Sequence, residues 1–573
     1  MNSSYHRPTA WKQQLRFLSG STTALNEHTV TFLPRAQAQN DNAPDDEFDM
    51  EYFAPTQRWK SLSSLSSYHG GERSRVPAIQ QFLRWLYLKV TPRSRTGELE
   101  VMKNRMQMGT GCDVSQLPGL SLTGEILFLP VFSKHLSSVL DSLGYSKEMA
   151  EFRQDVLQSL TSTLFRDPRY VHVVIGSRNA NDVFLGTADI DTLLVPKNII
   201  CTEKEGIITL PPDYTVVEML TDKCTPGYTE LRLASFGSKS LSDLRSCFVV
   251  DNGKIYVSSN LFRALQTRKN VKLSKERYLR SEILGIAVRP QKVVNYGLRC
   301  MCPDILKRWA QRRRAQNWPP NKTIQHVTRS EATLVVDSRI NPSVQREWRI
   351  CFFGAEQLLV RSLNDTQRKI LVILQCFART YFLPVTHRIS SFVLQTIVFW
   401  MAEEIPQESF TSSTLLDHTL DALRRLRDAV IDNCLPHYIM PERNLFAGRT
   451  DILTGQNLCR VMTELLDKGP ATFLLESVTI GPALRQLDVE AARKYQRLRD
   501  DLETACLKLL VLYHDPNLED DVWDFTPPHS RKHPDVRRLQ KTVVAIVSPD
   551  CLKHPVSVCC SQRINAQLRW LLT

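Results

Sequence analysis

The spacing of apolar residues divides the chain into three parts. Between Val76 and Arg166, apolar residues recur every three or four positions, as in IQQFLRWLYLKV and FRQDVLQSLTSTLF, and this period predicts amphipathic helices. From Tyr170 to Cys300 the apolar runs are short and rich in β-branched and aromatic residues, as in YVHVVIG, DIDTLLV and YTELRLAS. Such runs predict the strands of a mostly antiparallel or mixed sheet. After Pro303 the helical period returns. The pattern therefore predicts the α+β class, with a sheet lobe followed by a helical lobe.

Two short motifs predict local structure. The sequence Asp251-Asn252-Gly253 lies between two strand-like runs and is typical of a hairpin turn. Asp365 precedes the helical run TQRKILVILQCFARTYF, and we expect it to be the N-cap of that helix.

The two ends of the chain differ from its middle. Residues 1–75 are rich in Ser, Asn, Gln and Pro without a sustained period, which is typical of a disordered or loosely attached leader. The lack of acidic residues before Glu27 is also a feature of transit peptides. The predicted organisation is a leader (1–75), a helical lead-in (76–166), a sheet lobe (167–302), a helical lobe (303–446) and a helical extension with a Pro-rich, acidic break (447–573).

Composition and charge restrict the class of partner. A chain of 573 residues with 42% hydrophobic residues predicts two or three structural units, and a net charge of +13 favours polyanions such as nucleotides or nucleic acid. The 14 cysteines show no repeated spacing, which favours a reduced protein of the cytoplasm or the nucleus. Cys300 and Cys302 lack partners at metal-ligand spacing, so no zinc is expected. No apolar run reaches the ~18–20 residues of a membrane span. The oligomeric state is not predicted.

The segment VIGSRNANDVFLGTADIDTLLV carries the strongest candidate chemistry. Asp189 and Asp191 are two apart on a predicted strand, so both carboxylates face one side, where they can hold Mg²⁺ or Mn²⁺. Gly176 and Ser177 offer a close backbone approach and a hydroxyl to a phosphate. Two divalent cations are sufficient to align a hydroxyl for nucleotidyl transfer. Taken alone, such a pair of acids is also common on the solvated rim of a sheet.

Several blocks together resemble one known family. The Gly-Ser and Asp-x-Asp segment is followed in order by REWRICFFGAEQLLVRSLNDTQRKILVIL, ISSFVLQTIVFWMAEE and LPHYIMPERNLF. This arrangement resembles the male abnormal twenty-one (Mab) family, which includes cyclic GMP-AMP synthase and the related receptors of invertebrates. TPGYTELRL and the RCMCPDILKRW…NWPP segment resemble the expanded molluscan-type members. The likeness runs from about Leu120 to Phe446. It implies a bilobal nucleotidyltransferase fold, with a mixed-sheet lobe and a helical C-terminal lobe.

The resemblance assigns roles to individual residues. It implies that Asp189 and Asp191 are catalytic metal ligands and that Gly176 and Ser177 contact phosphate. It further implies that Arg349 lies near a nucleobase and that Ser391 lies near the phosphates. The remaining nucleotide-binding position is Phe392, which it implies stacks on a base.

Four positions depart from the family pattern. The third metal-binding acid falls on Val293, which has no oxygen ligand, and Asp337 is the alternative acid, although a strand-end turn also explains it. Gln375 replaces a phosphate-facing lysine, Phe353 replaces a small hydroxyl residue, and Ala180 replaces the first residue of a Glu-Gly step.

A basic cluster follows the predicted sheet. Its members are Lys307, Arg308, Arg312, Arg313 and Arg314. Such a cluster can bind phosphates, although a solvated basic face explains it equally well. Trp309 and Trp318 beside it can stack or pack. The resemblance implies a double-stranded RNA or DNA ligand, without the zinc insertion of the vertebrate DNA sensor. Trp348, Phe352, Phe399 and Trp400 are predicted to pack in the core.

Two functions remain open from the sequence. The first is a receptor that joins ATP and GTP into a cyclic dinucleotide in innate immunity when it senses nucleic acid. The second is a catalytically inactive binding or scaffold protein of the same fold. Asp189 and Asp191 favour the first, whereas Val293, Gln375, Phe353 and Ala180 favour the second.

Overall fold

The computed structural model of the chain describes residues 120–547 with several gaps. These gaps are 165–168, 175–191, 204–210, 239–241, 266–280, 284–285, 289–293, 337–345, 448–451, 468, 478–479, 487–488 and 514–533. The chain divides into two units, Met1–Arg75 and Val76–Thr573, and every described residue belongs to the second. The predicted leader therefore lies outside the described residues. So do Gly176, Ser177, Ala180, Asp189, Asp191, Val293 and Asp337.

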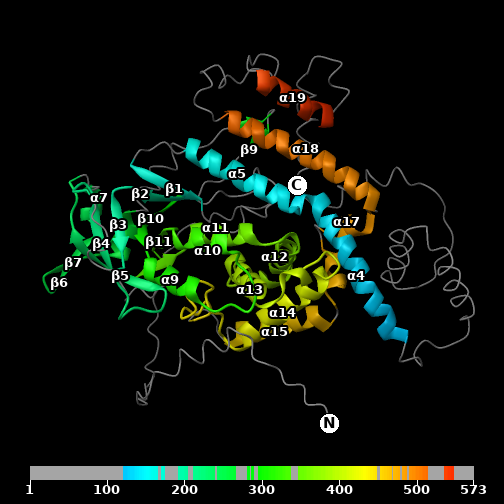
Figure 1. Cartoon of the computed structure of the whole chain (residues 1–573), viewed down its shortest axis with the longest axis horizontal. Helices are drawn as coiled ribbons and strands as arrows, with labels where there is room; N and C mark the ends of the chain where they lie inside the picture. The colour runs from blue at the N-terminus through cyan, green and yellow to red at the C-terminus, as the bar shows by residue number, and fades with distance from the viewer. Residues whose placement is uncertain are drawn as a thin grey trace, which may run out of the picture. The chain divides into compact units, whose positions relative to one another are not determined.

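Two helices precede the sheet and are separated by a break (Figure 1). They are α4 (Leu120–Leu140) and α5 (Lys147–Leu164), joined by the π-helical turn η4 (Asp141–Tyr145). Gly144 lies in this turn at φ +88°, a conformation that side-chain-bearing residues rarely adopt. An added Cβ atom at Gly144 would also lie 1.9 Å from a nitrogen of Arg499. The break therefore requires glycine for two separate reasons.

The strands follow in the predicted part of the chain. They are β1 (Tyr170–Val174), β2 (Thr192–Pro196), β3 (Ile199–Thr202), β4 (Thr215–Leu220), β5 (Tyr228–Ser235), β6 (Phe248–Asp251), β7 (Lys254–Val257), β8 (Ser281–Ile283), β9 (Ile286–Val288), β10 (Val294–Met301), β11 (Ala332–Val335) and β12 (Trp348–Cys351), with the short helix α7 (Ser242–Arg245) between β5 and β6. The mixture of helix and sheet confirms the predicted α+β class. Strands β11 and β12 come from the predicted helical lobe, so the sheet extends past the boundary predicted at residue 302.

The sheet is mixed, as predicted, and its pairings form a closed circuit. Strand β10 pairs with β11, which leads through β12, β5 and β4 to β3, and β3 pairs again with β10. The pairings β10–β2, β10–β3 and β3–β4 are parallel, and the others in this sheet are antiparallel. The hairpin prediction is confirmed, because β6 and β7 pair with Asp251 opposite Lys254. Both turn residues, Asn252 and Gly253, have positive φ.

The register of the parallel pair β2–β10 determines which residues lie opposite each other at the start of the two strands. Thr192 pairs with Val294 at the start of the ladder. The residues that precede them in the sequence are Asp191 and Val293, and both lie outside the described residues.

The later helices cover the rest of the described chain. They are α9 (Pro303–Gln311), α10 (Asn321–Thr328), α11 (Phe353–Ser362), α12 (Asp365–Phe377), α13 (Ser391–Glu404), α14 (Leu415–Ile431), α15 (Ile452–Asp467), α16 (Pro470–Glu476), α17 (Gly481–Gln486), α18 (Val489–Tyr513) and α19 (Pro534–Val547), with the short turns η5 (Ala378–Phe382) and η6 (Gln407–Ser409). The N-cap prediction for α12 was wrong by one residue. The cap is Asn364, whose side chain accepts the Gln367 N–H while the Gln367 side chain accepts the Asn364 N–H. This reciprocal pair satisfies two backbone donors, which Asp365 within the helix does not do.

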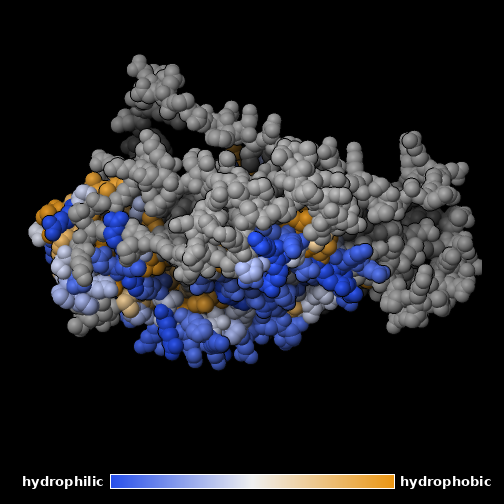
Figure 2. Space-filling model, turned by 90° about the horizontal axis from the view of Figure 1, so that it is seen from above, coloured by the Kyte–Doolittle hydropathy of each residue, from blue (hydrophilic) through white to orange (hydrophobic). Residues whose placement is uncertain are grey.

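The core prediction is confirmed for its aromatic members. Trp348, Phe352, Phe399 and Trp400 are all buried. On the face shown in Figure 2, hydrophobic residues are most concentrated toward the end where the sheet strands lie, and hydrophilic residues cover much of the remaining described surface. Exposed apolar side chains of this end include Val171, Phe236 and Val250. Among the described residues, no helix combines the length and apolar character that crossing a membrane requires.

Candidate functional site

Two of the predicted nucleotide-binding residues converge on one histidine. Arg349 lies on β12 and Phe392 lies in the first turn of α13. The Phe392 ring is 5.4 Å from the ring of His437, and the positive charge of Arg349 contributes to a lowered pKa of that histidine, after burial and Arg443. Ser391 begins α13 next to Phe392. The fold therefore brings Arg349 and Phe392, which come from separate sequence blocks, to a common neighbour.

His437 is held in one tautomer by its own turn. Its Nδ1 atom accepts the backbone N–H groups of Ile439 and Met440 at 3.0 and 3.2 Å. The Nδ1 atom therefore carries no proton, and the proton of the neutral ring is on Nε2. Burial first, and then the charges of Arg443 and Arg349, lower the pKa of His437 well below its ordinary value. The ring is therefore neutral near pH 7.

A carboxylate and a second arginine complete what we call the His437 cluster, consisting of Arg349, Glu356, Phe392, His437 and Arg443. The Nε2 atom of His437 lies 3.9 Å from Oε1 of Glu356 on α11. Burial raises the pKa of Glu356 to about 7, and the charges of Arg443 and Arg349 oppose this rise. Two guanidinium groups thus face one carboxyl group that is only partly ionised at neutral pH. The excess positive charge favours an anionic ligand.

Arg443 is fixed by the backbone of the sheet. One of its Nη1–H groups donates to the carbonyl oxygen of Ile350 at 3.3 Å, and its guanidinium lies 5.6 Å from the Tyr228 ring centroid. Gly227 makes room for this side chain, because an added Cβ atom would lie 2.3 Å from Cδ of Arg443. Gly227 also has a φ of +85°. The turn before β5 is therefore shaped to receive Arg443.

Two departures from the family pattern have structural explanations. Phe353, where a small hydroxyl residue is usual, packs against a buried apolar cluster that includes Leu193, Val335 and Cys351. Gln375, where a phosphate-facing lysine is usual, is buried in α12, and its Nε2 atom has no hydrogen-bond partner. Phe353 is therefore partly buried against the core, and Gln375 lies within it.

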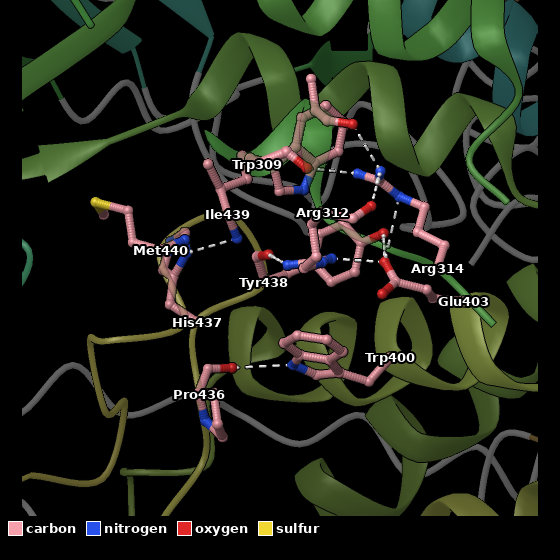
Figure 3. A network of polar contacts seen from close by, with 11 residues as sticks. Trp309, Arg312, Arg314, Trp400, Glu403, Pro436, His437, Tyr438, Ile439 and Met440 are labelled. Carbon is pink, nitrogen blue, oxygen red and sulfur yellow. Dashed lines mark hydrogen bonds and ion pairs between the residues drawn. The ribbon is translucent and has the colours of Figure 1, made fainter. Parts of the chain in front are cut away.

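A polar network holds the segment that carries His437 against α13 (Figure 3). Trp400 on α13 donates its indole N–H to the carbonyl oxygen of Pro436 at 3.0 Å. Arg312 donates to the carbonyl oxygen of Tyr438 at 2.7 Å and to Glu403 at 2.5 Å. The Tyr438 hydroxyl also donates to Glu403, at 2.7 Å. The residues on both sides of His437 are therefore fastened to α13.

The basic cluster predicted to bind nucleic acid divides into two groups. Arg312 and Arg314 are only 8% and 9% exposed, and both pair with Glu403. Arg312 also lies 4.7 Å from the ring centroids of Trp400 and Tyr438, and Arg314 lies 4.8 Å from that of Trp309. These two arginines serve the internal network instead of the phosphate-facing role that the sequence predicts, because both are covered and share Glu403 as an ion-pair partner. Trp309 and Trp318 are buried as well, so they pack and do not stack on a ligand.

Lys307, Arg308 and Arg313 form the exposed remainder of the cluster. Lys307 and Arg308 lie on α9, and Arg313 follows its C-cap at Arg312. These three residues keep the charge and exposure that phosphate contact requires.

The predicted metal site falls outside the described residues. Asp189 and Asp191 supply hard oxygen ligands of the kind that Mg²⁺ and Mn²⁺ prefer, but Val293 supplies no donor atom. The three-carboxylate set that the family resemblance implies is therefore incomplete, and we derive no chemical step through a metal. Within the described ranges, no group of three or more His, Cys, Asp or Glu side chains is placed to hold a metal ion.

Three members of the cluster were not predicted from the sequence. Glu356, His437 and Arg443 lie in sequence blocks that are rich in apolar residues, and such blocks predict packing. A signal was nevertheless present, because each is an ionisable residue within an otherwise buried stretch, and buried ionisable residues require partners. Asn444 stabilises the turn that carries His437 and Arg443, since its Oδ1 atom accepts the N–H groups of Leu435 and Phe446.

Comparison with known families agrees with this architecture. A mixed sheet leads into a helical region, and a family match falls in that region. Residues 366–465 match the family model described as the Mab-21 protein HhH/H2TH-like domain, which supports membership of the Mab-21 family. The match includes Ser391, Phe392, His437 and Arg443, and it continues past the predicted end at Phe446 into α15. No curated protein matches the chain.

Proposed function

We propose that this chain is a nucleotidyltransferase-fold protein of the Mab-21 type that binds a purine nucleoside triphosphate at the His437 cluster. The observation that carries the proposal is the convergence of Arg349 and Phe392 on His437 in a cluster with excess positive charge. Phe392 supplies a π-face for a base, and Arg349 supplies donors and charge. The partial Mab-21 match supports the same interpretation.

Nucleotide binding is tested by calorimetric titration with MgATP and MgGTP. We expect Arg349→Ala to weaken binding by roughly 10- to 100-fold, because hydrogen bonds to charged groups contribute about 1.5–3 kcal/mol. Phe392→Ala should weaken it by a similar factor, since base stacking contributes about 1–3 kcal/mol. Arg388→Ala removes an exposed arginine just before α13 and serves as the matched control. Equal affinity in all four proteins would place the nucleotide elsewhere.

A second candidate function is synthesis of a cyclic dinucleotide from ATP and GTP. Asp189 and Asp191 favour it, and the pairing of Thr192 with Val294 supports the interpretation that Val293 occupies the position of the third acid. We expect the wild-type chain to form little or no product with Mg²⁺ or Mn²⁺ and double-stranded nucleic acid. Val293→Asp should raise product formation, and adding Asp191→Asn should abolish it. Abundant wild-type product that depends on Asp191 would rule out the inactive scaffold.

The exposed basic residues Lys307, Arg308 and Arg313 support binding of double-stranded nucleic acid. Replacing all three with alanine should weaken binding to duplex DNA and reduce the slope of log affinity against log salt by about 2–3, because each phosphate contact contributes about 0.9. The control replaces three exposed basic residues of α18, Arg493, Lys494 and Arg497. Parallel titrations with duplex RNA and duplex DNA identify the ligand. An unchanged slope with both would exclude this surface.

A further inference from the structure

Three sulfur atoms contact one another at the C-terminal end of β10. Cys300 Sγ lies 2.9 Å from Met219 Sδ and 3.4 Å from Cys302 Sγ, and Cys302 Sγ lies 3.8 Å from Met219 Sδ. We propose that this sulfur cluster, consisting of Met219, Cys300 and Cys302, is a binding site for a soft monovalent cation, Cu(I). The proposal is independent of nucleotide binding, because it uses no residue of the His437 cluster.

The strand register explains why these side chains meet. In the parallel ladders Cys300 lies opposite Cys201, and Cys201 lies opposite Val217. Side chains two apart on a strand share a face, so Met219 is on the same face as Val217, and Cys302 is on the same face as Cys300. The third sulfur donor therefore comes from β4, 81 residues before Cys300. The sequence spacing of the cysteines alone does not reveal it.

The donor types favour copper over zinc. Thiolate and thioether sulfur are soft ligands, and Cu(I) is a soft cation that both of them suit. A structural Zn²⁺ ion instead takes four ligands from Cys, His and carboxylate side chains. Among the described residues, no group of three such side chains is placed to hold a metal ion. A set of two thiolates and one thioether therefore fits Cu(I) best.

The cluster has the size and the dryness that a three-sulfur site requires. Metal–thiolate bonds of ~2.3 Å in a trigonal plane place the sulfur atoms about 4.0 Å apart. The longest separation is already 3.8 Å. The shortest must lengthen by about 1 Å, which rotation of the flexible methionine side chain allows. All three side chains are buried, so water does not compete as a ligand.

The surroundings of the cluster provide a polar approach for a cation. Thr202 pairs with Met301, so Glu203 follows β3 where Cys302 follows β10. The Glu203 carboxylate accepts the N–H groups at the start of α9, which begins directly after Cys302. Glu203 is only partly buried. A negative charge in contact with solvent therefore lies beside the buried sulfur atoms.

Copper uptake by the reduced, full-length chain tests the proposal. The protein is titrated without oxygen against the Cu(I) complex of bicinchoninate, and we expect the wild-type chain to take one ion from this chelator. Two protons should be released per ion, because each of the two thiols gives its proton to solvent as its bond to copper forms. X-ray absorption of the loaded protein should show three sulfur atoms around the copper.

Met219→Leu is the most specific variant, because it removes the thioether and nearly conserves volume, so the fold should be retained. We expect it to bind Cu(I) about 10- to 100-fold more weakly, the range typical of losing one supporting group of a metal site, and to show two sulfur atoms around the copper. Met462→Leu makes the same change at another buried methionine and should match the wild type.

The two thiols are tested separately from the thioether. Cys300→Ser and Cys302→Ser should each abolish transfer of copper from bicinchoninate, because a hydroxyl is a poor ligand for Cu(I). Cys247→Ser makes the same change at a fully buried thiol outside the cluster and should retain transfer.

Three results would overturn the proposal. They are failure of the wild-type chain to take copper from bicinchoninate, equal copper affinity in Met219→Leu and Met462→Leu, and displacement of the copper by an excess of Zn²⁺. If a cysteine variant does not fold, the comparison of the two methionine variants still decides whether the cluster binds copper.

Discussion

Glu503→Gln is expected to lower the free energy of unfolding by about 3–5 kcal/mol, because it removes the single carboxylate shared by two buried arginines. Glu503 on α18 accepts from Arg153 on α5 at 2.6 and 2.8 Å, and its Oε2 lies 2.8 Å from Arg499. The exposed fractions of the Arg153, Glu503 and Arg499 side chains are 1%, 0% and 1%. A glutamine leaves the covered Arg153 guanidinium without its paired carboxylate and leaves Arg499 with Asp500 alone, at 3.3 Å.

The expected loss follows from where this triad lies. Arg153 also donates to the carbonyl oxygen of Gly144 at 2.6 Å, so the triad joins α18 to the break between α4 and α5. Figure 1 shows α18 running beside α5. Helix α18 belongs to the predicted extension after residue 446, and its burial of three charged side chains makes it part of the core.

Urea unfolding, followed by circular dichroism, measures this effect. The matched control is Asp501→Asn, which removes the same charge from an exposed position on the same helix and should change the stability by less than about 0.5 kcal/mol. Equal free energies of unfolding for Glu503→Gln and Asp501→Asn would mean that the triad does not stabilise the contact between α18 and the break between α4 and α5.

Glu403→Gln is expected to lower the free energy of unfolding by about 3 kcal/mol and to weaken nucleotide binding as well. Glu403 accepts from Arg312 and from the Tyr438 hydroxyl, and Arg314 lies 3.5 Å from the same oxygen. Arg312 keeps its bond to the Tyr438 carbonyl oxygen and its two aromatic neighbours, so the loss lies at the lower end for a buried ion pair. The effect on binding arises because Tyr438 adjoins His437 (Figure 3).

The two readouts distinguish this network from the triad on α18. Thermal unfolding and MgATP titration of Glu403→Gln should both change, whereas Glu408→Gln, an exposed glutamate beyond α13, should match the wild type in both. Glu503→Gln should change stability with little effect on affinity at a temperature where it is folded. If Glu403→Gln binds nucleotide with wild-type affinity, the network around Glu403 does not influence binding at the His437 cluster.

Local chemistry and periodicity predicted much of the fold. The hairpin at Asn252-Gly253 was predictable because two residues with positive φ satisfy that turn. The order of helices, sheet and helices followed from the change between helical and strand periods. Strand β11 was anticipated by the strand-end turn considered for Asp337, whereas β12 was absorbed into a helical lobe because its four residues are too few to establish a period against longer helical neighbours.

The site was predictable only in part. The sequence shows which residues are charged, but it does not show which of them are buried. Arg312 and Arg314 look like a phosphate-binding run in the sequence, yet their partner Glu403 lies on a helix far along the chain. Arg349 and Phe392 were predicted through the family resemblance, and the fold brings them to His437. His437 itself is an unremarkable residue of an apolar block until the turn at Ile439 and Met440 fixes its tautomer.

The most direct test of the account is to locate a bound nucleotide by photocrosslinking with 8-azido-ATP in the presence of Mg²⁺, followed by peptide mapping. Excess ATP should compete with the labelling. We expect label in the peptides that contain Ser391–Phe392 or His437, and loss of that label in Arg349→Ala. Competable label confined to other parts of the chain, or persisting unchanged in Arg349→Ala, would contradict nucleotide binding at the His437 cluster.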